Sequence, residues 1–164
     1  MPQAITITVS TLRIKPEALT RGIKAALAES GPAVESRVRQ HTPEGVGGSQ
    51  SGIRGSLFSE LRETGPIFAE VIGSSLPYAA PVEFGTKAPR RMPPVSALLP
   101  WVERFVATDD PEGVAFLIAR SIGRRGTKGA FMFQQGLEDS VPLIEKIFDV
   151  HVGEATVRLI EEGR

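Results

Sequence analysis

The stretch SLFSELRETGPIFAEVIG, Ser56–Gly73, decides the fold class, because it holds two apolar segments on either side of a turn. In Ser56–Glu63 and Ile67–Gly73, apolar residues partly alternate with polar ones, which is typical of β-strands. The tetrapeptide ETGP between them supplies the glycine and proline of a tight turn. The stretch therefore predicts a β-hairpin, although the imperfect alternation leaves its register open.

The residues before this hairpin predict one more strand and a long helix. Ala4–Ile14 begins with strict alternation of apolar and polar residues, which indicates a half-buried strand and a candidate for the edge of the sheet. From Glu17 to about Gln40, apolar residues recur at helical spacing. The dipeptide Gly31-Pro32 is expected to interrupt or kink this helix.

The residues after the hairpin are mainly helical by their pattern. Helical spacing of apolar residues predicts a helix over Val95–Val106 and another from Pro111 to about Arg124, with an aspartate just before the proline as N-cap. Another helical region begins at Phe131 and is kinked or restarted at the tripeptide SVP, which starts at Ser140. Gly85 and Gly126 fall outside these regular segments.

The order of strand, helix, strands and helices predicts an α+β fold, with a small antiparallel sheet covered by an N-terminal helix and several C-terminal helices. A chain of 164 residues favours a single domain over residues 1–164. Within it, residues 1–94 would form the sheet-containing core with its loops, and residues 95–164 a helical C-terminal extension. The longest apolar run, Ala115–Ala119, is far too short to cross a membrane.

Composition excludes several kinds of chemistry. The chain has no cysteine, which rules out disulfides, thiolate metal sites and thiol nucleophiles, and only two histidines, which lie far apart in the sequence. The 19 basic and 19 acidic residues cancel, whereas dedicated nucleic-acid binders usually carry a basic excess. No dinucleotide-binding loop, phosphate loop or serine elbow is present. The sequence therefore predicts no catalytic residue, no metal and no cofactor.

Glu83 is the one carboxylate in an unusual setting, between Val82 and Phe84. One interpretation is a carboxylate that accepts backbone N–H hydrogen bonds at a cap or turn. The other is a catalytic acid, which would require a cleft and a second carboxylate or histidine within hydrogen-bond reach.

Two clusters of basic residues leave a second function open, a small nucleic-acid-binding module that uses its arginines to contact phosphate. Arginines at the end of a helix also complement the helix dipole without binding anything. The cluster around Arg90 and Arg91 is flanked by prolines, which is typical of a stiff interaction arm. The clusters are Lys87, Arg90 and Arg91, and Arg120, Arg124, Arg125 and Lys128.

Two motifs between Gly52 and Pro94 resemble those of the neck family of tailed bacteriophages, the small proteins that join head to tail or complete the tail. The first motif, G-x-[LI]-R-x-S-[IL], is matched by Gly52, Ile53, Arg54, Ser56 and Leu57. The second is a tyrosine-alanine stretch that closes in V-E-[FY]-G-T, matched by Tyr78, Ala79, Val82, Glu83, Phe84, Gly85 and Thr86. A proline-rich run follows, as in the family. Many members end soon after that run, whereas this chain continues, which leaves open its position in the neck or tail.

The resemblance implies a non-enzymatic virion protein, assembled in the bacterial host cytoplasm, that forms a ring of its own copies, six by analogy with the family. Its neighbours would be connector or head-completion proteins and tail-tube or tail-terminator proteins, with DNA only passing through the lumen and no membrane involved. The residues implied at subunit or partner interfaces are Tyr78, Val82, Glu83, Phe84, Gly85 and Thr86, with Gly45, Gly47, Gly48, Arg90 and Arg91 on two loops that act as arms. Arg124, Arg125 and Lys128 are the candidates for facing the DNA.

Overall fold

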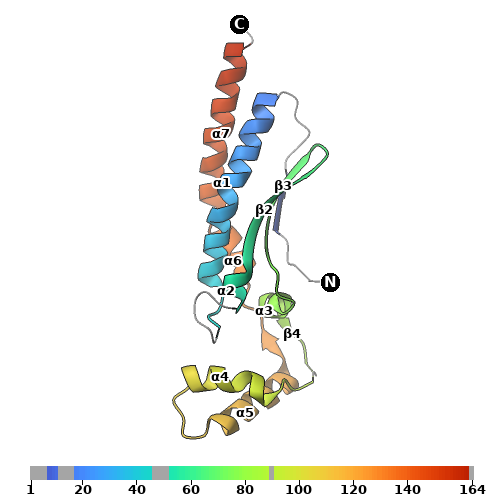
Figure 1. The fold of residues 1–164 in the computed structure, drawn as a ribbon, viewed down its shortest axis with the longest axis vertical. Helices are drawn as coiled ribbons and strands as arrows, with labels where there is room; N and C mark the ends of the chain where they lie inside the picture. Colours follow the sequence, from blue (N-terminus) through green and yellow to red (C-terminus); the bar gives the residue numbers. More distant parts are fainter. Residues whose placement is uncertain (1–6, 11–16, 46–51, 89–90, 163–164) are drawn as a thin grey trace.

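The computed structural model describes residues 7–10, 17–45, 52–88 and 91–162. The molecule is elongated (Figure 1): two long helices run side by side at one end, a sheet lies against one of them, and a pair of shorter helices forms the other end. The predicted α+β class is confirmed. None of the helices in the described ranges combines the length and apolar character needed to cross a bilayer.

The sheet has three antiparallel strands in the order β1-β3-β2, namely β1 (Ile7–Ser10), β2 (Leu57–Thr64) and β3 (Ile67–Ser74). Strands β2 and β3 form the predicted hairpin, and their register pairs Leu57 with Ser74 and Thr64 with Ile67. The turn uses Gly65 at a φ of +59°, a conformation that glycine adopts without steric cost. β1 pairs along the other side of β3, so it is an edge strand, as expected.

Helix α1 (Glu17–His41) lies on the sheet and buries an apolar stripe that includes Leu27, Val34 and Val38. The sequence predicts an interruption or a kink at Gly31-Pro32, and the interruption is not found, because α1 is one continuous helix with Pro32 inside it. Gly31 has a packing role instead. A Cβ at this position would overlap the carboxylate of Glu70, which projects from β3 toward the helix.

Helices α6 (Met132–Glu138) and α7 (Val141–Glu162) pack against α1. Two histidine–carboxylate contacts link these helices, with the Nε2 of His41 2.8 Å from an oxygen of Asp139 and that of His151 2.7 Å from an oxygen of Glu29. The restart predicted near Ser140 is confirmed, because α6 ends and α7 begins there. The main core lies where α1, α6 and the sheet meet, and its buried residues are Val34, Val38, Ile53, Leu57, Ile72, Ala79, Met132 and Phe133.

A helical hairpin is inserted between two very short strands, β4 (Gly85–Thr86) and β5 (Thr127–Lys128), which pair antiparallel. It consists of α4 (Val95–Phe105) and α5 (Pro111–Arg125), which pack on each other around Val102, Ala115 and Ala119. As predicted, an aspartate caps α5: Asp110 accepts a hydrogen bond of 2.9 Å from the backbone N–H of Gly113. We call the rest of the molecule, which is the three-stranded sheet with α1, α2, α3, α6 and α7, the body. The hairpin leaves the body at β4 and returns at β5 (Figure 1).

Candidate functional site

The first motif of the sequence, Gly52–Leu57, forms helix α2 (Gly52–Ser56) and the start of β2. The Nε–H of Arg54 donates to the carbonyl of Thr42 at 2.7 Å, which attaches α2 to the end of α1. The hydroxyl of Ser56 lies 2.6 Å from that of Ser74 at the end of β3. These polar residues of the motif therefore connect α2 to the end of α1 and to the end of β3.

The second motif forms helix α3 (Ala79–Phe84) and strand β4. Glu83 on α3 is buried, and its carboxylate accepts hydrogen bonds from the backbone N–H groups of Phe133 at 3.0 Å and Gln134 at 3.3 Å. These groups belong to the first turn of α6, where backbone donors lack partners within the helix and negative charge is favourable. Glu83 is therefore the cap of a helix that lies far along the chain, with Phe133 50 residues after Glu83.

This geometry overturns the hypothesis that Glu83 is a catalytic acid. That hypothesis required a second carboxylate or a histidine within hydrogen-bond reach of Glu83. The hydrogen bonds to its side chain among the described residues come from backbone N–H groups instead. Elsewhere in the described ranges, no three histidine, cysteine or acidic side chains lie close enough together to hold a metal ion.

The second motif pairs directly with the segment after the helical hairpin. Besides the β4–β5 pairing, the N–H of Ala130 donates to the carbonyl of Val82 at 2.8 Å, and that of Phe131 to the carbonyl of Glu83 at 3.1 Å. The hydroxyl of Thr86 lies 3.0 Å from that of Thr127. We call this paired backbone, residues 82–86 with residues 126–131, the junction.

Glycines allow the two segments of the junction to approach closely. A Cβ on Gly85, Gly126 or Gly129 would overlap backbone atoms of the opposite segment, and the first two also have φ values near +75°. Any other residue at these three positions would force the segments apart. The junction therefore depends on glycine at positions that lie far apart in the sequence.

Two aromatic residues beside the junction are exposed. Phe84, the last residue of α3, is 65% exposed, and Tyr78, just before α3, is 47% exposed, although the core holds the α3 backbone through Ala79 and Glu83. Val82 packs against the core, while Gly85 and Thr86 are partly buried. The structure thus brings the residues of the second motif together as a fixed surface with two protruding rings.

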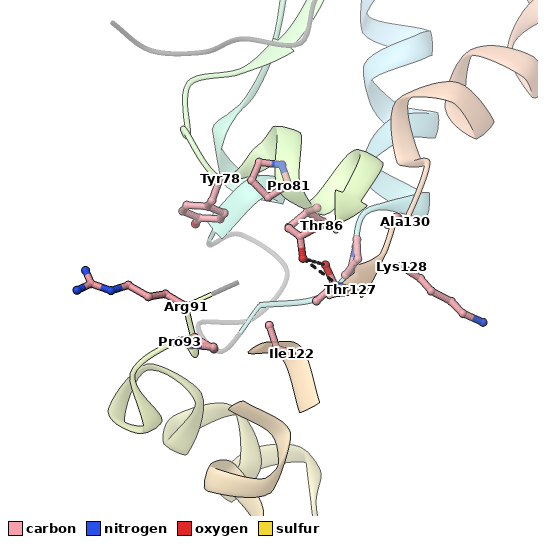
Figure 2. A pocket seen from close by; sticks show the side chains of 12 residues that line it. Tyr78, Pro81, Thr86, Arg91, Pro93, Ile122, Thr127, Lys128 and Ala130 are labelled. Atoms are coloured by element: carbon pink, nitrogen blue, oxygen red, sulfur yellow. Dashed lines mark hydrogen bonds between the residues drawn. The ribbon is translucent and has the colours of Figure 1, made fainter. Parts of the chain in front are cut away.

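A pocket of about 520 Å³ lies between this surface and the hairpin. Figure 2 shows Tyr78 and Thr86 on one wall, with Pro93 and Ile122 on the side of the hairpin. Its lining contains prolines and two cations, Arg91 and Lys128, but no acidic residue. The two cationic side chains extend away from each other on opposite sides, so they do not converge on one ligand (Figure 2).

The remaining predicted site residues are dispersed. Arg124 and Arg125 are exposed in the last turn of α5, where their charge complements the helix dipole. Gly45 is partly buried at the end of the segment after α1. Gly47, Gly48 and Arg90 lie outside the described residues.

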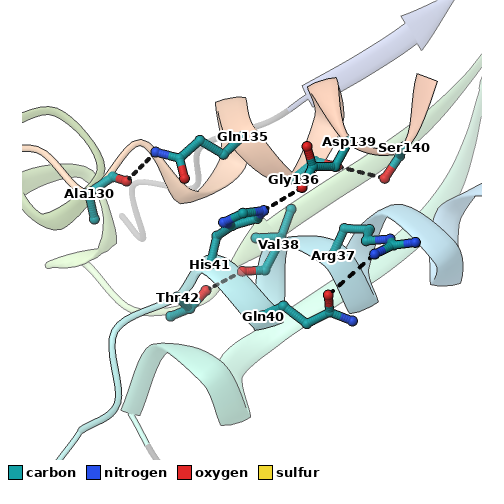
Figure 3. A network of polar contacts seen from close by, with 10 residues as sticks. All are labelled: Arg37, Val38, Gln40, His41, Thr42, Ala130, Gln135, Gly136, Asp139 and Ser140. Atoms are coloured by element: carbon teal, nitrogen blue, oxygen red, sulfur yellow. Dashed lines mark hydrogen bonds and ion pairs between the residues drawn. The ribbon is translucent and has the colours of Figure 1, made fainter. Parts of the chain in front are cut away.

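A polar network supports the junction from the side of the core (Figure 3). The amide of Gln135 donates to the carbonyl of Ala130 at 3.3 Å, and the contact between the imidazole of His41 and the carboxylate of Asp139 ties α6 to the end of α1. The hydroxyls of Thr42 and Ser140 are buried and donate to the carbonyls four residues earlier. The start of α6, and with it the junction, is thereby fixed to the longest helix of the molecule.

Sequence analysis did not place Gly126, Thr127, Gly129 and Phe131 beside the second motif, where they form one side of the junction. The signal that could have found them is the similarity of two Gly-Thr dipeptides, Gly85-Thr86 and Gly126-Thr127. Comparisons of the chain with protein-family models, with curated proteins and with solved structures find no match.

Proposed function

We propose that this protein is a structural subunit of a tailed-phage or prophage particle, and that it forms a ring at the head–tail junction or in the upper tail. The proposal rests on the resemblance of the two motifs to the neck family. The observation that carries it is the pair of exposed rings, Tyr78 and Phe84. Their backbone is fixed by the core and by the pairing of β4 with β5. Exposed aromatic residues on a rigid support are typical anchors of protein–protein interfaces.

The inserted hairpin accounts for part of the length by which this chain exceeds the family pattern. Many members end soon after the proline run, and this chain has a long continuation. In space, however, β5 follows directly on β4, because residues 87–126 form a separate excursion. Part of the extra length is thus an insertion next to the surface Tyr78–Thr86, and it leaves Phe84 exposed. The rest, α6 and α7, packs against α1.

In this proposal, subunits dock through the platform Tyr78–Thr86, and the pocket beside it receives a segment of the neighbouring subunit. The apolar lining of prolines and Tyr78 suits an extended chain, and Arg91 and Lys128 at its margins suit an acidic one. Such a contact joins two different surfaces of the same chain. Heterologous contacts of this kind close into rings when the rotation between subunits allows it.

The test is the molar mass by light scattering over a range of concentrations, alone and with connector or tail-tube proteins of a tailed phage. We expect a discrete closed species of roughly six subunits, the number that the resemblance to the neck family implies. Phe84→Ser should abolish this species and change the free energy of unfolding by less than about 0.5 kcal/mol, because the ring is mostly exposed.

The control is Ile67→Ser, which removes an exposed apolar side chain at the far hairpin turn and should leave assembly unchanged. A chain that stays monomeric at every concentration, and that binds neither class of phage protein, would contradict the proposal. Assembly that persists in Phe84→Ser would show that the ring forms through another surface.

A further inference from the structure

The outer face of α5 carries exposed apolar residues between two opposite charges. Leu117 is 60% exposed and Phe116 is 45% exposed, because α4 covers only the face of α5 that holds Ala115 and Ala119. A two-helix hairpin cannot bury two faces of the same helix. Within the part of the chain that the structure describes, the outer face of α5 is therefore an unpartnered apolar surface.

The charges on this face are ordered along the helix. Asp109 and Asp110 lie at its start, and Arg124 and Arg125 form its last turn. Two copies of α5 placed antiparallel would therefore set the acidic start of each helix against the basic end of the other. The helix dipoles favour the same arrangement.

Residue sizes on this face fit the same arrangement. With Leu117 on a two-fold axis, position 113 of one copy faces position 121 of the other, and position 110 faces position 124. Ser121 is small, and the Asp110 carboxylate that caps α5 lies over Gly113, so this carboxylate meets the small Ser121 of the other copy. The basic last turn of each helix then lies beside the acidic start of the other, with Arg125 next to Asp109.

A hollow on α5 borders the exposed leucine. Leu117, Arg120, Ser121, Arg124 and Arg125 line a recess of about 190 Å³ on the C-terminal half of the helix. In the antiparallel arrangement, the two Leu117 side chains meet at the edge of this recess, and Phe116 of each copy lies at the flank of the contact.

We propose that α5 docks on α5 of a second copy of this chain, antiparallel and two-fold symmetric about Leu117. The contact goes beyond the proposed ring, because an isologous contact joins two copies and then closes, whereas a ring needs heterologous contacts elsewhere. It also gives Arg124 and Arg125 a protein partner in place of DNA.

Disulfide trapping tests the symmetry directly, because the natural chain has no cysteine. Leu117→Cys places a thiol on the axis, and mild oxidation should give a covalent dimer at least roughly tenfold faster than for a thiol outside the contact. The matched control is Ser96→Cys, an exposed position on α4 of the same hairpin. Equal rates for the two variants would overturn the proposal.

Charge exchange tests the pairing of the helix ends. Arg125→Glu should weaken dimerisation roughly tenfold, because each contact contains the altered pair twice. Adding Asp109→Lys to that variant should restore it, since the two charges are then merely interchanged. Failure of the double variant to recover would overturn the antiparallel register.

The outcome is separable from that of the proposed function. Leu117→Asp should remove the dimer and leave ring assembly through Phe84 in place. Rings without trapping at position 117 would refute the α5 contact alone. Trapping at position 117 in a chain that never forms rings would support the α5 contact and count against the ring.

Discussion

Glu83 connects two distant parts of the chain through a charge on a helix end. Its carboxylate accepts hydrogen bonds from the N–H groups of Phe133 and Gln134, and a neutral amide cannot accept both as well. We expect Glu83→Gln to lower the free energy of unfolding by about 1–2 kcal/mol, measured by urea denaturation. Glu112→Gln, in the exposed first turn of α5, is the matched control and should change it by less than about 0.5 kcal/mol. Equal losses in both variants would argue against the capping role.

Glu70 is a buried acid whose ionisation makes the stability of the fold depend on pH. One oxygen accepts a hydrogen bond of 2.6 Å from the hydroxyl of Ser59, and the other, Oε2, has no hydrogen-bond partner among the described residues. Burial raises the pKa of Glu70 above its ordinary value of 4.5, and the nearby charge of Glu60 adds to this, whereas the bond from Ser59 opposes it. The folded protein therefore holds the proton of Glu70 to a higher pH than the unfolded chain does.

The effect on stability follows from this direction. Because the folded state binds the proton more tightly, the stabilisation is present at low pH and is lost as the pH rises from 4.5 through the raised pKa. Glu70→Gln removes the ionisation, so we expect the variant to gain stability relative to the natural protein as the pH rises. Thermal unfolding of both proteins from about pH 4 to pH 8 measures the difference. A difference that stays constant with pH would contradict the raised pKa.

At the scale of elements, two helical glycines make opposite predictions. A Cβ on Gly153 of α7 would have no atom within 4 Å, whereas one on Gly22 of α1 would lie 2.8 Å from Ala155 Cβ, where α1 and α7 touch. We expect Gly153→Ala to raise the free energy of unfolding by about 0.5–1 kcal/mol, because alanine restricts the unfolded chain and favours the helix. Gly22→Ala should lower it, because the two helices must separate. Denaturant unfolding of both variants checks the signs, and a loss of stability in Gly153→Ala would show that α7 is packed there.

Elements set by neighbouring residues were predictable from the sequence. The β2–β3 hairpin, α5 with its aspartate cap, and the break between α6 and α7 follow from turn, cap and breaker residues that are adjacent in the chain. The short elements α2, α3, β4 and β5 were missed. They are stabilised by distant partners, as when Gly85 pairs with Lys128, and no local pattern specifies them.

The candidate site was predictable only in parts. The motif around Glu83 and the basic cluster around Lys128 were each recognised, and a cap was one of the two roles considered for Glu83. Their meeting was not predicted, because it depends on the close approach that Gly126 and Gly129 permit between segments far apart in the chain. The uninterrupted course of α1 through Pro32 has a similar origin, since packing on the sheet outweighs the local effect of proline.

At the scale of the molecule, the inserted hairpin should be separable from the body. Thr86 and Thr127 are paired neighbours, so replacing residues 87–126 with a two-residue Asn-Gly turn closes the chain without moving either strand. We expect the shortened protein to fold with its α1–α7 layer intact. Circular dichroism and a cooperative thermal transition would measure this, and loss of cooperative unfolding would show that the hairpin is part of the core.

The position of the hairpin also divides the optical signals of the protein. The chain has one tryptophan, Trp101, which lies on α4 with its ring centre 5.6 Å from that of Phe105, and one tyrosine, Tyr78, which lies on the body beside α3. Indole emission therefore reports on the inserted hairpin alone, while the phenol absorbance reports on the surface around the junction. A single unlabelled sample thus carries a separate intrinsic probe for each end of the molecule.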